Sequence, residues 1–384
     1  MKKDFLKTGL LDSLMRGIIS KMIFEIHKSC LKLLAEEDPD VCSMLNSLAT
    51  NRRKELNVII ADRDVLDYLK NCTLLEVNAR RLFDYLRRKI HETKELKKVV
   101  SRYYTIVANN GIECDNCHIV TVSDILKKEF LSKTQLIVED LTDFKFYHYI
   151  GFYFASKNRI NCHLSFDMAP GGGRNSAGLF DGLIKQENRL LLGIFDGDQK
   201  YPGDKIGETL KAVLKIIDSK DRKFFECISL AEQGVHEAEN LIPLKLIEEI
   251  YDSREINAQN TIKFLNRLYE ERSDLYFYFD MKEGIYRVDK KYTDKDKYDA
   301  CWKDCVESFK VSETLESLYI SKVITSQCDL LKKVIEYLSE KSSGDGDDLI
   351  FIFENFVKNT FVDSKWTELG KEIFTWGCVG RRIP

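Results

Sequence analysis

Short apolar runs alternate with amphipathic segments in the middle of the chain. The runs are 135–138 (QLIV), 160–166 (INCHLSF), 190–195 (LLLGIF) and 224–231 (FFECISLA). Apolar residues at helical spacing fill the intervening segments 144–156, 177–187 and 205–219. Apolar strands that alternate with helices are typical of a parallel sheet that is covered by helices. We therefore predict an α/β fold whose Rossmann-like parallel sheet, with helices on both faces, occupies residues 131–250.

The two flanking regions show mainly helical patterns. In residues 1–130 apolar side chains recur every three or four positions, and charges of both signs fill the remaining faces. Residues 251–384 have similar spacing, except that 274–288 (DLYFYFDMKEGIYRV) predicts a strand or a hairpin. The length of 384 residues suits a division into two or three domains.

Composition narrows the class of protein. A formal net charge of −3 does not suit a protein with a basic surface throughout, so a nucleic-acid partner would need a local basic patch. No apolar run reaches the roughly 20 residues of a membrane span, and residues 1–24 lack the pattern of a signal peptide. The eleven cysteines are scattered, which is typical of reduced thiols. These features predict a cytoplasmic protein that does not enter a membrane.

Carboxylates follow three of the four predicted strands. They are Glu139 and Asp143, then Asp196 and Asp198, then Glu237 and Glu239. Ligands of open parallel sheets bind beyond the carboxyl ends of the strands. Two unit charges about 4 Å apart repel each other by roughly 4 kcal/mol at an intermediate dielectric. A divalent cation removes this penalty, and oxygen ligands of this kind suit Mg²⁺ or Mn²⁺. Such an ion could activate water for phosphodiester cleavage.

Each acid also has a simpler explanation. A single Asp-x-Asp is more often a turn or a helix cap than a metal site. Asp143 could cap the helix that follows it, and Glu237 and Glu239 could be loop residues that face solvent. The occurrence of acids after consecutive strands favours the metal site.

Basic, aromatic and histidine residues near this edge leave alternatives open. Arg174 in GGGRNS could grip a phosphate or lie in a tight turn. Lys200 could neutralise a scissile phosphate or offset the local negative charge, and Lys205 is a further candidate for nucleic-acid contact. The aromatic run 144–154 could stack bases, but its helical spacing favours core packing. His236 adjoins the third acidic pair, where proton transfer or an ordinary hydrogen bond would both suit it.

The motifs LIVEDLTDFKFY, FDGDQ and HEAENLIP resemble successive motifs of the TOPRIM domain. That domain occurs in topoisomerases, bacterial primases and nucleases of the overcoming-lysogenisation-defect (OLD) family. The resemblance covers about residues 135–250, and APGGGRNSAGL is similar to the glycine-rich loop of OLD-like members. It implies that Glu139, Asp196 and Asp198 hold a primary Mg²⁺ or Mn²⁺, and that Asp143 and Glu239, with Glu237, hold or orient a second ion. Arg174, Lys200 and Lys205 would then contact nucleic acid.

The resemblance also implies a function. We expect a metal-dependent endonuclease of anti-phage defence that acts on DNA or RNA, including tRNA. The alternative is a regulatory module that binds a metal without catalysis. The chain is too short for the clamp domain of a topoisomerase. For a primase, Cys114, Cys117 and His118 form at most half a zinc site. No ATP-binding P-loop is present, so we expect a separate ATPase or sensor chain as partner, or self-association.

Overall fold

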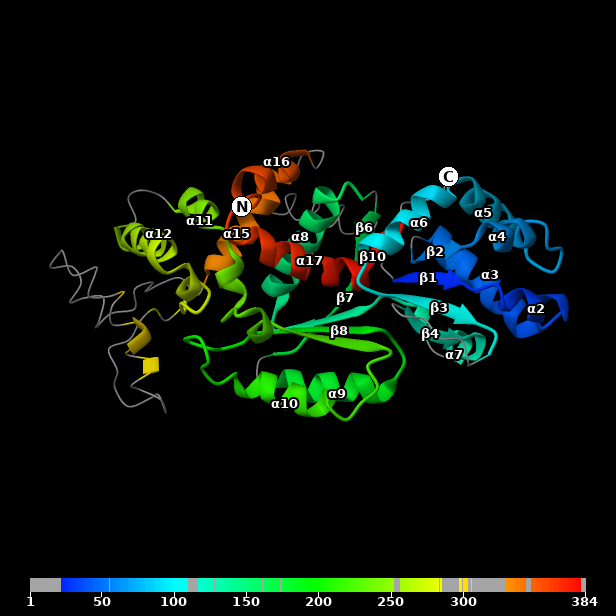
Figure 1. Cartoon of the computed structure of the whole chain (residues 1–384), viewed down its shortest axis with the longest axis horizontal. Coiled ribbons are helices and arrows are strands. Elements are labelled where there is room, and N and C mark those ends of the chain that lie inside the picture. The colour runs from blue at the N-terminus through cyan, green and yellow to red at the C-terminus, as the bar shows by residue number, and fades with distance from the viewer. Residues whose placement is uncertain are drawn as a thin grey trace, which may run out of the picture.

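The computed structural model describes residues 22–54, 56–109, 117–127, 129–160, 162–172, 175–251, 256–282, 284, 297–298, 300–302, 305, 329–342 and 347–380. Two parallel four-stranded sheets with attached helices form the framework (Figure 1). The sheets contact each other where Arg102 Nη1 lies 2.6 Å from Glu226 Oε2 and Tyr104 donates a hydrogen bond to the carbonyl oxygen of Lys223. The predicted α/β class, with a parallel sheet between helices, is confirmed.

The first sheet has the strand order β2-β1-β3-β4. Its strands are β1 (Ile23–Ile26), β2 (Val58–Ala61), β3 (Tyr103–Val107) and β4 (Cys117–Thr121). Its helices are α2 (Cys30–Ala35), α3 (Pro39–Arg53), α4 (Arg63–Leu69), α5 (Val77–Arg88), α6 (Ile90–Val99) and α7 (Val122–Lys127). The helical prediction for residues 1–130 therefore missed a sheet. These strands have only four or five residues, and an apolar run of that length has the same pattern as part of a buried helix.

The second sheet has the order β7-β5-β8-β9, and all its strands are parallel. They are β5 (Gln135–Val138), β7 (Asp167–Pro170), β8 (Leu191–Phe195) and β9 (Phe225–Ser229). Helices α9 (Ser176–Gln186) and α10 (Glu208–Ile217) cover one face, and α8 (Leu141–Lys157) covers the other (Figure 1). Because both faces are covered, the central strands β5 and β8 are almost continuously apolar.

One predicted strand of this sheet is misplaced in the sequence analysis. Residues 160–166 do not enter the sheet; β6 (Cys162–Leu164) pairs instead with β10 (Cys378–Gly380) in an antiparallel ribbon. The sheet position is taken by β7, which pairs with β5 from Asp167 onward. The strand in the sheet, β7, is less apolar than residues 160–166. It lies at the edge of the sheet, where a strand can be short and partly exposed.

The C-terminal region, where the structure describes it, is helical apart from β10. After α11 (Leu244–Ile250), which ends the preceding segment, its described helices are α12 (Ile256–Tyr276), α15 (Leu330–Lys341), α16 (Asp347–Phe356) and α17 (Asp363–Gly377). The strand predicted for 274–288 is wrong for its first part, because α12 continues to Tyr276. Helix α17 packs along α8, and Trp366 contacts Phe146 and Tyr153 there. The aromatic side chains of α8 thus belong largely to the core, which was the favoured prediction.

The described helices include none that combines the length and apolarity of a membrane span.

Candidate acidic site at the carboxyl edge of the second sheet

The first two predicted acids lie at the junction of β5 and α8. Glu139 directly follows the strand and is exposed. Asp140 begins α8, and its Oδ1 accepts hydrogen bonds from the amides of Thr142 and Asp143 at 2.6 and 3.0 Å. Asp143 Oδ2 accepts in return from the amide of Asp140 at 3.1 Å. This reciprocal cap fixes the Asp143 carboxylate on the first turn of α8, so the capping alternative holds for this turn, with Asp140 as the cap.

Asp196 and Asp198 lie in a tight turn after β8. The amides of Gly197 and Asp198 both donate to the carbonyl oxygen of His236, at 2.8 and 2.9 Å. A Cβ at position 197 would lie 2.6 Å from the carbonyl oxygen of Val235, so this contact requires glycine. Asp198 has a left-handed backbone with φ of 55°, which an Asp tolerates better than most residues. The turn is therefore fixed against the loop that follows β9.

The third pair lies on that loop. Both glutamates are buried, Glu237 at the N-cap of the short 3₁₀-helix η4 (Ala238–Leu241) and Glu239 within it. Asn240, in the same motif, is fully buried and its Nδ2 donates to the carbonyl oxygens of Tyr276 and Phe279, at 3.1 and 2.7 Å. This amide attaches the segment after α12 to the acidic edge. That segment carries two further charged residues of the site.

Those residues are Asp280 and Lys282. Lys282 Nζ lies 3.0 Å from Glu237 Oε2 and 2.9 Å from Glu239 Oε1. Burial alone would lower the pKa of Lys282, but the two carboxylates raise it far above its usual value. Burial and the charge of Glu239 raise the pKa of Glu237 to about 8. The ammonium group of Lys282 thus lies between the two carboxylates and contacts both.

A second ion pair lies beside the first. Lys200 Nζ is 2.8 Å from Asp280 Oδ2, and His236 Nε2 is 3.6 Å from the same oxygen. Burial tends to raise the pKa of Asp280, yet the hydrogen bond from His236 and the charge of Lys200 hold it well below its usual range. Burial tends to lower the pKa of His236, but Asp280 and the charge of Glu237 raise it. These neighbours thus favour the protonated form of His236.

The remaining acids experience strong mutual repulsion. Burial, followed by the charges of Glu139 and Asp143, raises the pKa of Asp196 well above its usual value. Burial and the charge of Asp140 raise the pKa of Asp143 to about 7. Partial desolvation and the charge of Asp198 raise the pKa of Glu139. The chain thus brings all six predicted acids to one edge of the sheet.

Five of the six acids fall into two groups by their partners, and the sixth, Asp143, accepts a hydrogen bond from the amide of Asp140. Glu237 and Glu239 have Lys282, whereas no ion pair or side-chain hydrogen bond involves Glu139, Asp196 or Asp198 within the described part of the chain. These three carboxylates without an ion-pair partner supply the oxygen donors that Mg²⁺ or Mn²⁺ prefers. The predicted primary ligands thus fit a divalent ion by charge and donor type. Their role as ligands stays a prediction.

One other group could hold a metal. Across the described residues, His236, Glu237 and Asp280 have ligand atoms within 4.8 Å of one another. The Nδ1 of His236 and the Oε1 of Glu237 are buried without hydrogen-bond partners. Asp280 is already paired with Lys200, however, so a cation there would have to compete with an ammonium group.

The predicted basic residues have different positions. Arg174 lies outside the described residues. Lys205 is exposed, and its backbone amide donates to Asp204 Oδ1. The ammonium group of Lys200 is engaged by Asp280, so its predicted contact with phosphate stays a prediction. Cys114 also lies outside the described residues.

The half zinc site loses one ligand in the structure. Cys117 is disulfide-bonded, which corrects the prediction of a reduced thiol at this position. A sulfur in a disulfide has no thiolate to offer zinc. Cys301 and Cys305 are free cysteines.

Sequence reasoning missed Asp280, Lys282 and the positioning role of Asn240. The pattern FDMKEG does place an acid and a lysine close together. It follows a helix rather than a strand of the sheet, however, so the rule that finds residues at strand ends does not apply to it. The hydrogen bonds of Asn240, together with that from the amide of His236 to the carbonyl oxygen of Phe277, bring this segment to the edge.

Comparison of the chain with protein-family models, curated proteins and solved structures gives no match.

Proposed function

We propose that this protein is a divalent-metal-dependent nuclease that cleaves phosphodiester bonds at the acidic edge of its second sheet. The observation that carries the proposal is the set of three carboxylates, Glu139, Asp196 and Asp198, without a cationic partner at the end of two central parallel strands. Like charges that gather at one edge repel one another unless a ligand compensates them. The resemblance of these motifs to TOPRIM nucleases supports the same assignment.

The surrounding residues support a role in hydrolysis. A divalent ion held by these carboxylates would activate water and stabilise the leaving oxygen. His236 has a raised pKa and lies on the loop that supports the Asp196 turn, so it is placed as a proton donor. Lys282 offsets negative charge of the second acidic pair at the edge where a phosphate would approach. We therefore propose one tightly held ion, with Lys282 in the place of a second.

The test is a cleavage assay in Mg²⁺ or Mn²⁺ on plasmid DNA, single-stranded DNA and total RNA. The test variant is Asp196→Asn with Asp198→Asn, which keeps side-chain size and removes the charge. Loss of metal-ligand charge of this kind should reduce the rate by about 10²-fold or more. The matched control is Glu208→Gln with Asp218→Asn, two exposed acids of α10 or its C-terminal cap. Equal cleavage by the test variant and the wild type would refute the proposal.

The substrate and the setting are further parts of the proposal. We propose a cytoplasmic effector of anti-phage defence that cuts DNA or RNA, including tRNA. Sequencing of nucleic acids broken in cells that express the wild type, compared with cells that express the Asp196→Asn variant, would identify the substrate. Breaks confined to tRNA would define a ribonuclease, and dispersed chromosomal or phage breaks a deoxyribonuclease.

A non-catalytic metal-binding module is the second candidate. The observation in its favour is that lysines already balance Glu237, Glu239 and Asp280, as in a structural ion-pair network. Such a module would show a rise in melting temperature with Mn²⁺ but no cleavage of any nucleic acid.

Control by another protein also belongs to the proposal. A nuclease of broad specificity would damage its own cell, so we propose a separate ATPase or sensor chain that restrains or delivers it, with self-association as the simpler assembly. The mass of the complex purified from native cells would distinguish a partner chain from self-association. A monomer that cleaves fully without any added protein would refute the proposal of a partner.

A further inference from the structure

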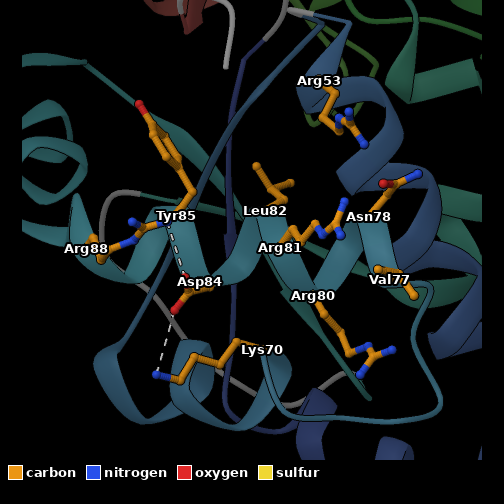
Figure 2. A pocket seen from close by; sticks show the side chains of 10 residues that line it. All are labelled: Arg53, Lys70, Val77, Asn78, Arg80, Arg81, Leu82, Asp84, Tyr85 and Arg88. Atoms are coloured by element: carbon orange, nitrogen blue, oxygen red, sulfur yellow. Dashed lines mark ion pairs between the residues drawn. The ribbon is translucent and has the colours of Figure 1, made fainter. Parts of the chain in front are cut away.

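A cavity of about 500 Å³ lies in the N-terminal region, away from the acidic site. Helices α3, α4 and α5 and the residues at their ends form its walls (Figure 2). The lining residues are Arg53, Lys70, Val77, Asn78, Arg80, Arg81, Leu82, Asp84, Tyr85 and Arg88. Five of these side chains are cationic and one is a carboxylate, so the cavity has a strong positive charge in a chain whose net charge is negative.

The carboxylate compensates only part of this charge. Asp84 Oδ2 lies 3.3 Å from Arg88 Nη2, and its Oδ1 lies 3.9 Å from Lys70 Nζ. Figure 2 shows these two cations beside Asp84 on one side of the cavity. Within the described residues, Arg53, Arg80 and Arg81 form no ion pair. Three arginines thus have guanidinium groups without an acid.

Arg80 gives a second, independent indication of a ligand. Its Nε is buried and has no hydrogen-bond partner. A buried guanidinium N–H that donates to nothing is costly, and an anionic oxygen would remove the cost. The backbone at Arg80 is also held in place, because four buried residues of α5 pack into the core: Ala79, Leu82, Phe83 and Leu86. The polar face of α5 therefore holds its arginines in place.

The chemistry of the lining selects the ligand. Guanidinium groups bind phosphate oxygens in bidentate fashion. A site for a free nucleotide would also need an apolar enclosure for the base, and here only Val77, Leu82 and Tyr85 are apolar or aromatic. Arg53 and Arg81 are exposed, so the charged surface continues outward from the cavity. These features fit a continuous phosphate backbone.

We propose that this cavity binds the phosphodiester backbone of a nucleic-acid strand and holds it for the acidic site. The inference rests on the proposed nuclease function and adds the surface that retains the substrate. An edge with six carboxylates repels a polyanion, so retention has to come from elsewhere on the chain. Figure 1 places α5 near one end of the molecule and α11, which closely follows Glu239 in the chain, towards the other end. A nucleic-acid strand that reaches both the cavity and the acidic edge is therefore longer than a few nucleotides.

The experiment measures binding of fluorescent 30-mer DNA and RNA, single- and double-stranded, in EDTA, where no cleavage occurs. The test variant is Arg53→Ala with Arg81→Ala, since both side chains are exposed and form no ion pair, and Arg80→Ala is measured separately. The control is Lys94→Ala with Lys98→Ala, which removes two exposed cations of α6 that are paired with Asp62 and Glu95. We expect affinity at least tenfold weaker in the test variant than in the control. The slope of log Kd against log salt should fall by about two, close to one for each lost phosphate contact.

Three outcomes decide the proposal. Equal affinity and salt slope in the wild type and the double variant would overturn it, even if the wild type cleaves nucleic acid. Tight binding of ATP or inorganic pyrophosphate that depends on these arginines, without any effect on oligonucleotides, would also overturn it in favour of a small phosphate ligand. If the Asp196→Asn with Asp198→Asn variant binds the oligonucleotide as the wild type does, the cavity is supported even where cleavage fails.

Discussion

Replacement of Lys282 by methionine tests the charge balance of the acidic edge. Lys282 Nζ lies about 3 Å from a carboxylate oxygen of both Glu237 and Glu239. Each contact corresponds to about 5 kcal/mol of Coulomb attraction at an effective dielectric of 20, before desolvation. Removal of one partner from a buried ion pair typically costs about 3–5 kcal/mol.

The expected cost is smaller here for two reasons. The Lys282 side chain is 37% exposed, so solvent screens part of the interaction. The pKa of Glu237 is already about 8, so in the variant this carboxyl can remain neutral at pH 7. We expect a loss of about 2–3 kcal/mol in the free energy of unfolding without metal, or a fall in melting temperature of roughly 5 °C. The control Lys211→Met breaks an exposed pair with Glu208 and should cost less than about 1 kcal/mol.

Divalent ions should reverse this effect. Without Lys282, two carboxylates become available to a cation, so Mn²⁺ should stabilise Lys282→Met more than the wild type. Tenfold tighter binding adds about 1.4 kcal/mol at saturation. Thermal unfolding with and without Mn²⁺ measures this difference, and calorimetric titration should show the stoichiometry rising from one ion towards two. If Mn²⁺ stabilises both proteins equally with the same stoichiometry, the reasoning is refuted.

Two further predictions follow from the same edge. The folded-state pKa of Asp143 is raised to about 7, so its contribution to stability is present below pH 4 and is lost as the pH rises towards 7. Asp143→Asn should therefore flatten the decline in melting temperature between pH 4 and 7, with a gain of at most about 4 kcal/mol at pH 8; an unchanged profile would contradict this assignment. Gly197→Ala would bring a Cβ within 2.6 Å of the Val235 carbonyl oxygen, and we expect a loss of about 1–3 kcal/mol in urea unfolding. A fully stable variant would show that the turn is not fixed as described.

The sequence alone determined three strands of the second sheet and the acids at its edge. Strands β5, β8 and β9 were predicted because a strand that is buried on both faces appears in the sequence as a short apolar run. Glu139 and Asp196 were found because parallel strands end at a common edge of the sheet. This information is local, since a strand and the residue after it are neighbours in the chain. The first sheet was missed because four apolar residues also fit a helix, as at Ile23–Ile26.

Only the tertiary structure decided which charges meet. Lys282 reaches Glu237 and Glu239 because Asn240 donates hydrogen bonds to the chain between α12 and Asp280. Likewise, the basic cavity combines Arg53 from α3 with Arg81 from α5. Such pairings join residues far apart in the chain, and the packing of whole helices and loops sets them. The periodicity of the sequence does not predict these pairings. It indicates which side of a helix or strand is buried, but not which residues of other elements that side contacts.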